Sequence, residues 1–181
     1  SLGCPTLDLD LVAREVTRPG QPVLDVIADR LGTALISPEG ELDRAALAHL
    51  IFRDGTARAC LDEILHPAIL DVAEQWVQGQ ANRPSPSPVV MLEVPLLFEA
   101  GLEKSVDRIV LVTAEPEGRV ARLVNERGMA HADAMARISA QQPDSVKRDR
   151  SHYVIENDGS LEELEPQVRS VWGHLLKDAG A

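Results

Sequence analysis

The most restrictive feature of the sequence is a short apolar run that ends in an acid. Residues 89–94 read Val-Val-Met-Leu-Glu-Val, and Pro95, which cannot donate to a strand ladder, follows them. Runs of this kind lie buried in parallel sheets, and ligands bind outside the carboxyl ends of such strands. The run therefore predicts a strand that delivers Glu93 to a binding site, although a buried strand followed by a plain turn fits the same residues.

Further short apolar runs alternate with helical patterns along the chain. Arg108–Thr113 and Tyr153–Glu156 are typical of strands, and Pro5-Thr6-Leu7 predicts a strand that ends at Asp8. The predicted helices are Asp10–Val16, Pro22–Leu31, Asp43–Phe52, Thr56–Leu65, one that restarts at Pro67, Pro116–Glu126, His131–Gln141 and a C-terminal helix capped by Ser160. The alternation predicts a three-layer α/β fold with a parallel sheet.

One run of helices, over about residues 22–81, separates the first strand from the second. It is too long for a simple crossover connection, so we expect an inserted helical lobe. The expected organisation is a single domain over residues 1–181, with its core in residues 1–21 and 89–181.

Charge and composition limit the partners of the chain. The net charge of −11 argues against nucleic acid, because phosphate backbones normally require a basic face. A small phosphorylated ligand needs only local positive charge, and residues 119–150 concentrate Arg and Lys. No apolar run approaches the roughly 20 residues that cross a bilayer, and no signal-peptide pattern is seen, so we expect no membrane partner and a cytoplasmic location. Cys4 and Cys60 have no partner at metal spacing.

Several motifs appear in one order along the chain. They are Asp8-Leu9-Asp10 with Ala13-Arg14-Glu15-Val16, Leu65-His66-Pro67, Leu92 to Glu99, and Ile155-Glu156-Asn157-Asp158-Gly159-Ser160. Together they closely resemble the dephospho-coenzyme A kinase family, over nearly the whole chain. The resemblance implies a P-loop kinase fold, with Mg²⁺ and ATP as cofactors and dephospho-coenzyme A as the acceptor. The implied reaction is phosphoryl transfer to the ribose 3′-hydroxyl, the last step of coenzyme A synthesis.

The acids after the first strand are the leading catalytic candidates. Phosphoryl transfer to an alcohol needs a carboxylate that accepts or orients the hydroxyl proton. Asp10 follows the strand and could also be a simple helix N-cap. The resemblance implies that Asp10 is the general base and Asp8 a substrate-binding residue. Arg14, one turn on, could contact substrate or form a salt bridge to Asp10, and Glu93 is expected to hold Mg²⁺.

Other sites follow from the resemblance. It implies that the His66-Pro67 corner and Phe98 bind the substrate, although His66 also fits a purely structural role. Residues 119–150 resemble the mobile lid of P-loop kinases, and Arg137 matches the lid position that reaches the phosphates. The remaining implied residues are those that bind ATP, namely Arg122, Asn157 and Gly159, of which the last two also form an Asn-Asp-Gly turn.

The phosphate-binding loop of P-loop kinases, G-x-x-x-x-G-K-[ST], is absent from the 181 residues. The family also implies a central strand before that loop, and Ser1 aligns just ahead of the second strand of the family. We therefore expect a truncated chain. The alternatives are a non-catalytic relative that keeps the fold, with or without coenzyme A binding, and another small-molecule P-loop kinase. The sequence leaves the oligomeric state open.

This expectation can be tested by calorimetry on the 181-residue chain. Because the loop amides and Lys bind the triphosphate, the chain is predicted to show weak or no affinity for Mg-ATP and no kinase activity. Binding of dephospho-coenzyme A is expected to depend on the helical lobe instead. Micromolar binding of ATP by this chain would place the phosphate site elsewhere.

Overall fold

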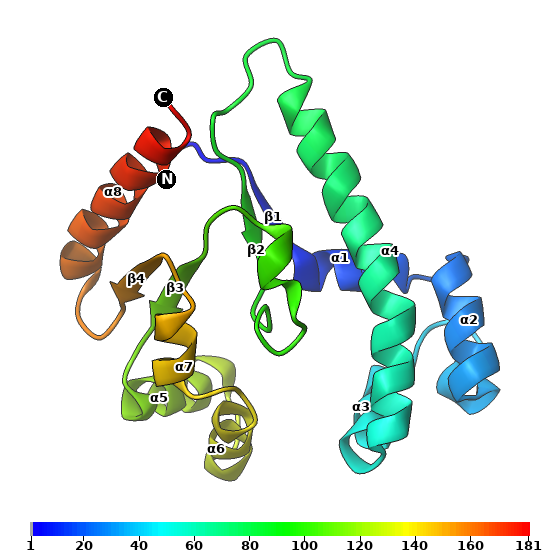
Figure 1. Cartoon of the computed structure of the whole chain (residues 1–181). Coiled ribbons are helices and arrows are strands. Elements are labelled where there is room, and N and C mark those ends of the chain that lie inside the picture. The colour runs from blue at the N-terminus through cyan, green and yellow to red at the C-terminus, as the bar shows by residue number, and fades with distance from the viewer. Residues whose placement is uncertain (1) are drawn as a thin grey trace. The chain divides into compact units, whose positions relative to one another are not determined.

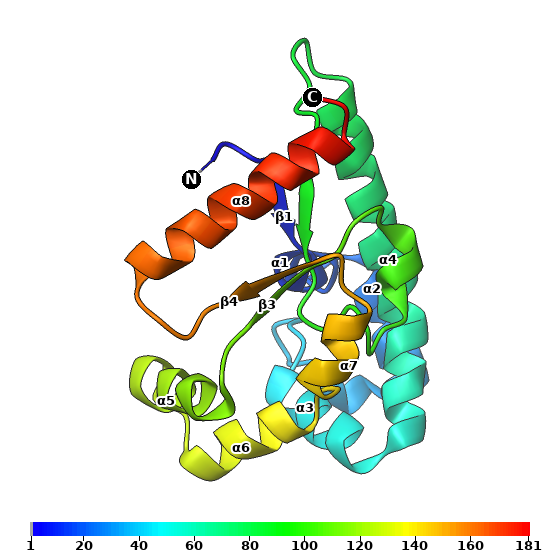
Figure 2. The same ribbon diagram turned by 60° about the vertical axis from the view of Figure 1, so that its left-hand side comes forward.

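The computed structural model describes residues 2–181, which divide into two compact units, Gly3–Val94 and Pro95–Ala181. Figures 1 and 2 show the elements of each unit. In the first unit they are β1 (Thr6–Asp8), α1 (Leu9–Val16), α2 (Pro22–Leu31), the 3₁₀ helix η1 (Thr33–Leu35), α3 (Arg44–Arg53), α4 (Gly55–Ala81) and β2 (Met91–Glu93). In the second they are η2 (Leu102–Ser105), β3 (Val110–Thr113), α5 (Pro116–Arg127), α6 (His131–Ser139), α7 (Asp144–Asp149), β4 (Tyr153–Glu156) and α8 (Leu161–Asp178).

The strands form two hydrogen-bonded pairs, and both are parallel, as the sequence predicted. In the first unit β1 pairs with β2, which places Asp8 beside Glu93 at the carboxyl end. In the second unit β3 pairs with β4, which places Thr113 beside Glu156. Polar and acidic side chains therefore lie at the edge where ligands bind in α/β folds.

The first unit has two apolar cores joined by one long helix. Helices α2 and α3 enclose the larger core with the N-terminal half of α4, around the fully buried Ile27. The smaller core packs Leu9 and Val12 of α1 against Ala73 of α4. Figure 1 shows α4 alongside α1, α2 and α3. Helices α2, α3 and α4 occupy the range assigned to the helical lobe, whose boundaries remain a prediction.

The predicted break in this region is wrong. The sequence suggested that one helix ends near Leu65 and another begins at Pro67, but α4 is continuous from Gly55 to Ala81 with Pro67 inside it. Proline lacks the N–H that would bond the Glu63 carbonyl, and an interior proline costs about 3 kcal/mol. Packing of α4 against both cores outweighs that cost, and no local pattern reveals such packing.

The predicted cap of α1 is also wrong by two residues. The extended backbone of Asp8, with φ −88° and ψ 114°, makes Asp8 the N-cap. Its Oδ1 accepts from the amides of Asp10 at 2.8 Å and Leu11 at 3.2 Å. Asp10 instead occupies the first helical turn, so its carboxylate is not used to cap the helix.

The second unit crosses from β3 to β4 through α5, α6 and α7. Helix α5 ends at Gly128, whose φ of 64° stops the helix as expected. The sequence did not predict α7, because six residues are too few to show a helical period. No helix among residues 2–181 is long and apolar enough to cross a membrane.

Helix α8 begins with the predicted capping box. The Ser160 hydroxyl accepts from the Glu163 amide, and the Glu163 carboxylate accepts from the Ser160 amide at 2.8 Å. This folded-back Glu163 leaves no room at the preceding residue, because a Cβ on Gly159 would lie 2.0 Å from Glu163 Oε2. A side chain at position 159 would therefore displace the Glu163 carboxylate from its cap.

We predict that Gly159→Ala destabilises the chain by about 1 kcal/mol, since Glu163 must withdraw from its cap. Urea unfolding measures the change. Gly173→Ala is the matched control on the same helix, because its Cβ meets nothing within 4 Å. That control is expected to stabilise by up to about 1 kcal/mol through helix propensity. Equal effects of the two changes would contradict the steric argument.

Candidate active site

Three acidic residues lie at or just after the carboxyl end of the β1–β2 pair. Asp8 and Glu93 are register partners, and Asp10 follows in the first turn of α1. The Asp8 carboxylate is occupied by the helix cap. Asp10 and Glu93 are exposed, and in the described part of the chain no hydrogen bond or ion pair engages either side chain. Both are available to a ligand.

Arg14 lies on the same helix, in its last turn, and is exposed. Of its two sequence-based interpretations, the salt bridge to Asp10 is not formed: the ion pairs within residues 2–181 include none between them. Contact with a substrate remains the prediction for Arg14.

The donors at this edge fit Mg²⁺. Carboxylate oxygens are its usual protein ligands, and it is commonly held by one or two carboxylates together with substrate phosphates. Asp8 and Glu93 supply two such groups side by side. Residues 2–181 hold no group of three or more His, Cys, Asp or Glu side chains that could bind a metal. The metal role of Glu93 remains a prediction.

His66 and Pro67 lie on α4 where its two cores meet. Leu65 packs against the larger core and Ile69 against the smaller one. The His66 ring is partly exposed, and its Nε2 lies 3.9 Å from Asp62 Oδ1. Pro67 is exposed. His66 is thus not locked into a core, and its predicted contact with the substrate stays untested.

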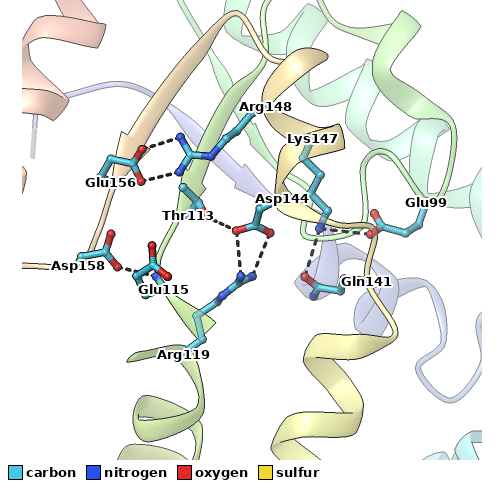
Figure 3. A network of polar contacts seen from close by, with 10 residues as sticks. All are labelled: Glu99, Thr113, Glu115, Arg119, Gln141, Asp144, Lys147, Arg148, Glu156 and Asp158. Carbon is cyan, nitrogen blue, oxygen red and sulfur yellow. Dashed lines mark hydrogen bonds and ion pairs between the residues drawn. The ribbon is translucent and has the colours of Figure 1, made fainter. Parts of the chain in front are cut away.

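A hollow of about 430 Å³ lies at the carboxyl end of the β3–β4 pair. It is lined by the strand ends, the start of α5 and the segment that joins α6 to α7. Figure 3 shows several of its polar side chains. Asp144 pairs with Arg119 at 2.9 and 3.2 Å and accepts a hydrogen bond from the Thr113 hydroxyl. Asp144 therefore connects α7 to α5 and to the end of β3 on the wall of the hollow.

A second ion pair, in which the guanidinium bonds both carboxylate oxygens, joins α7 to β4. Arg148 donates to both carboxylate oxygens of Glu156, at 2.6 and 2.7 Å. The hydrogen bond and charge of Arg148 hold the pKa of Glu156 below its usual value. Glu156 is therefore ionised at neutral pH, and both of its carboxylate oxygens accept from Arg148.

A third pair is buried beside the hollow. Lys147 Nζ lies 3.3 Å from Glu99 Oε1 and donates to Gln141 Oε1 at 3.2 Å. The Gln142 amide also donates to Glu99 Oε1, at 2.8 Å. Burial raises the pKa of Glu99, but this hydrogen bond and the Lys147 ammonium outweigh burial and leave that pKa below normal.

The predicted ATP-binding residues are brought together by the loops after β3 and β4. Arg122 donates to the Asn157 carbonyl, and the Asn157 amide donates to the Thr113 carbonyl at 2.7 Å. The Glu115 amide donates to the Asp158 carboxylate at 2.6 Å. Gly159 follows on the same loop. Arg122 and Asn157 thus have local structural partners, and their contact with ATP remains a prediction.

Arg137 and Phe98 differ in accessibility. Arg137 is exposed in the last turn of α6, and no hydrogen bond or ion pair engages its guanidinium within the described chain. Phe98 is buried, with the Arg150 guanidinium 4.8 Å from its ring centre. Phe98 therefore packs within its unit, and a substrate contact would involve little of its surface.

The sequence did not reveal the ion pairs of this unit. Asp144 lies 25 residues from Arg119, and Glu99 is also remote in the chain from Lys147, so no short-range spacing signals either pair. The concentration of Arg and Lys in residues 119–150 was the only sign in the sequence that charged contacts form in this unit. It suggested phosphate contacts, whereas most of these cations meet acids of their own unit.

Comparisons with known proteins bear on the whole chain. The sequence model of the dephospho-CoA kinase family matches residues 1–163. A dephospho-CoA kinase of Moorella thermoacetica is 39% identical over 176 residues, which cover 97% of this chain and 82% of the relative. One of Corynebacterium glutamicum is 37% identical over 172 residues, covering 94% and 87%.

Solved structures agree on the fold. The crystal structure of TT1252 from Thermus thermophilus matches with a TM-score of 0.80 and 35% identity, over 96% of this chain and 85% of that one. The dephospho-CoA kinase from Campylobacter jejuni matches with a TM-score of 0.66 over 98% and 87%, and at 21% identity it supports the fold alone. The chain therefore belongs to the dephospho-CoA kinase family, the ATP-dependent kinases of coenzyme A biosynthesis, and has their P-loop kinase fold.

Proposed function

We propose that this protein transfers the γ-phosphoryl group of ATP to the ribose 3′-hydroxyl of dephospho-coenzyme A. The observation that carries the proposal is the exposed carboxylate of Asp10, which follows β1 and has no protein partner within residues 2–181. Asp8 supplies the helix cap, so Asp10 is spared that structural role. Membership of the family supports dephospho-coenzyme A as the acceptor.

Asp10 acts as the general base in this proposal. Its carboxylate accepts the proton of the 3′-hydroxyl as the 3′-oxygen bonds to the γ-phosphorus. The bond from the γ-phosphorus to the bridging oxygen breaks, and ADP leaves with that oxygen. Asp10 lies in the first turn of α1 and is exposed, so the hydroxyl of an acceptor can approach its carboxylate.

Arg137 stabilises the charge that spreads over the transferring group. A planar guanidinium can bond two phosphate oxygens at once, and Arg137 has no acid of its own to release first in the described residues. Glu93, with Asp8 beside it, would hold Mg²⁺. Bound Mg²⁺ would neutralise phosphate charge.

The remaining roles divide between the two substrates. Arg14 and the exposed corner at His66 and Pro67 are proposed to bind the acceptor, with Phe98 supporting it from a buried position. Arg122, Asn157 and Gly159 are proposed to border ATP, because Arg122 of α5 bonds the Asn157 carbonyl on the loop that follows β4, where Gly159 also lies.

The 181 residues hold no phosphate-binding loop, so catalysis is measured in a protein that carries one. In this extended protein the first strand and glycine-rich loop of a family member precede Ser1. It is expected to phosphorylate dephospho-coenzyme A at the 3′-hydroxyl. Comparable activity on a nucleoside monophosphate would overturn the proposed acceptor.

Asp10→Asn is predicted to lower kcat of the extended protein by about 10²-fold or more, with little change in substrate binding, because the amide cannot accept the proton. Steady-state kinetics give both constants. Asp25→Asn is the matched control, since Asp25 is an exposed acid in the first turn of α2 and loses the same helix-dipole interaction. Near-normal turnover of Asp10→Asn would remove Asp10 as the base.

Arg137→Ala is predicted to lower kcat by about 10²-fold while KM changes little, because the guanidinium acts on the transition state. Lys177→Ala is the control, an exposed cation in the last turn of α8 with no ion pair in the described structure. A loss confined to KM would assign Arg137 to ground-state binding instead.

A further inference from the structure

The Glu99–Lys147 pair is less exposed than the other ion pairs within residues 2–181. The side chains are 13% and 7% exposed, whereas Arg169 and Glu165, a pair on α8, are each 62% exposed. Moving two charges out of water is expensive, and a buried pair often stabilises less than apolar residues of the same volume. Stability alone therefore does not explain this pair.

The hydrogen bonds of the pair point to a geometric role. Glu99 Oε1 receives both the Lys147 ammonium and the Gln142 amide, while Glu99 Oε2 is buried with no hydrogen-bond partner within residues 2–181. One carboxylate oxygen thus binds two parts of the chain, and the other oxygen binds none that the structure describes. An unsatisfied buried acceptor is destabilising. A role in holding the chain in place therefore explains this arrangement better than a gain in stability does.

The segment held by this pair is the one that follows α6. Lys147 donates to the side chain of Gln141 (Figure 3). Glu99 accepts from the backbone amide of Gln142. The Gln141 amide in turn donates to the Ile138 carbonyl at 3.2 Å, so the last turn of α6 continues directly into the held residues. Arg137 belongs to that last turn.

The other end of α6 has no comparable attachment in the described residues. Helix α5 ends at Gly128, in a left-handed conformation that favours glycine. The α6 cap, Ala130, makes no side-chain hydrogen bond. Helix α6 packs on α5 through the fully buried Ala134. Beyond its packing on α5, the C-terminal turn of α6 is followed by residues held by Glu99, by Lys147 and, at 3.3 Å through the Gln142 side chain, by Arg150.

We propose that Glu99 and Lys147 are positioning residues for Arg137: they fix the C-terminal end of α6 so that the Arg137 guanidinium is held for phosphoryl transfer. This inference rests on the proposed function of Arg137. Neither residue touches the reacting atoms. The effect is transmitted through Gln141 and Gln142.

The decisive variant replaces both charges by apolar residues of similar size, Glu99→Leu with Lys147→Met. No isolated buried charge remains in this double variant, so the unit is expected to fold with an unchanged or higher thermal midpoint. Glu99→Gln is the conservative variant, because its amide oxygen still accepts from Lys147 and from the Gln142 amide. Glu165→Leu with Arg169→Met removes an exposed pair by the same substitutions and serves as the control.

The first measurement is amide hydrogen exchange in the 181-residue chain, which needs no activity. The double variant is expected to exchange about tenfold faster over residues 131–142, with α8 unchanged, because the end of α6 is released. Over residues 131–142, Glu99→Gln and the α8 control are expected to match the parent chain. Glu99→Gln also leaves the Lys147 ammonium without a counter-charge, so its thermal midpoint is expected to fall. Unchanged exchange over residues 131–142, or faster exchange throughout Pro95–Ala181 with a lower thermal midpoint, would overturn the anchoring role.

The second measurement is steady-state kinetics in the extended protein. The double variant is expected to lose about tenfold or more in kcat with less than about twofold change in either KM, and Glu99→Gln is expected to recover most of the loss. Faster amide exchange over residues 131–142 together with an unchanged kcat would overturn the positioning role. If the parent extended protein fails to phosphorylate dephospho-coenzyme A, the proposed function is wrong, and the exchange comparison still decides whether the pair anchors α6.

Discussion

A parallel strand pair can form only if the chain returns from the carboxyl end of one strand to the amino end of the next. Both pairs of this protein meet that requirement with helices, α1 to α4 in the first unit and α5 to α7 in the second. Each connection leaves its first strand at the edge where ligands bind. The connecting helices therefore carry Asp10 and Arg137, and those of the first unit also build its two apolar cores.

Ion pairing within the second unit decides which Arg and Lys side chains remain available to an anionic ligand. Arg119, Lys147 and Arg148 each meet an acid of the same unit, in keeping with an acidic chain of net charge −11. Arg137 is exposed and has no such partner in the described residues. An anionic ligand that reaches Arg137 does not have to compete with a carboxylate for its guanidinium.

Local signals predicted what local forces determine. The residues of β4, the stop of α5 at Gly128 and the capping box of α8 follow from neighbours in the sequence. Continuity of α4 through Pro67 depends on two cores that no window of sequence contains. The ion pairs of the hollow join residues far apart in the chain, so the sequence indicated the positive charge there but not its partners.

Pro67 makes the backbone hydrogen bonding of α4 uneven along its length. Because its nitrogen carries no hydrogen, the turn of α4 that begins at Glu63 lacks one rung of the helical ladder. This turn is also the point where α4 passes from the core around Ile27 to the core around Ala73. Bending there breaks one hydrogen bond fewer than bending elsewhere inside α4. The backbone ladder of the α4 interior is therefore weakest beside His66, at the boundary between the two cores.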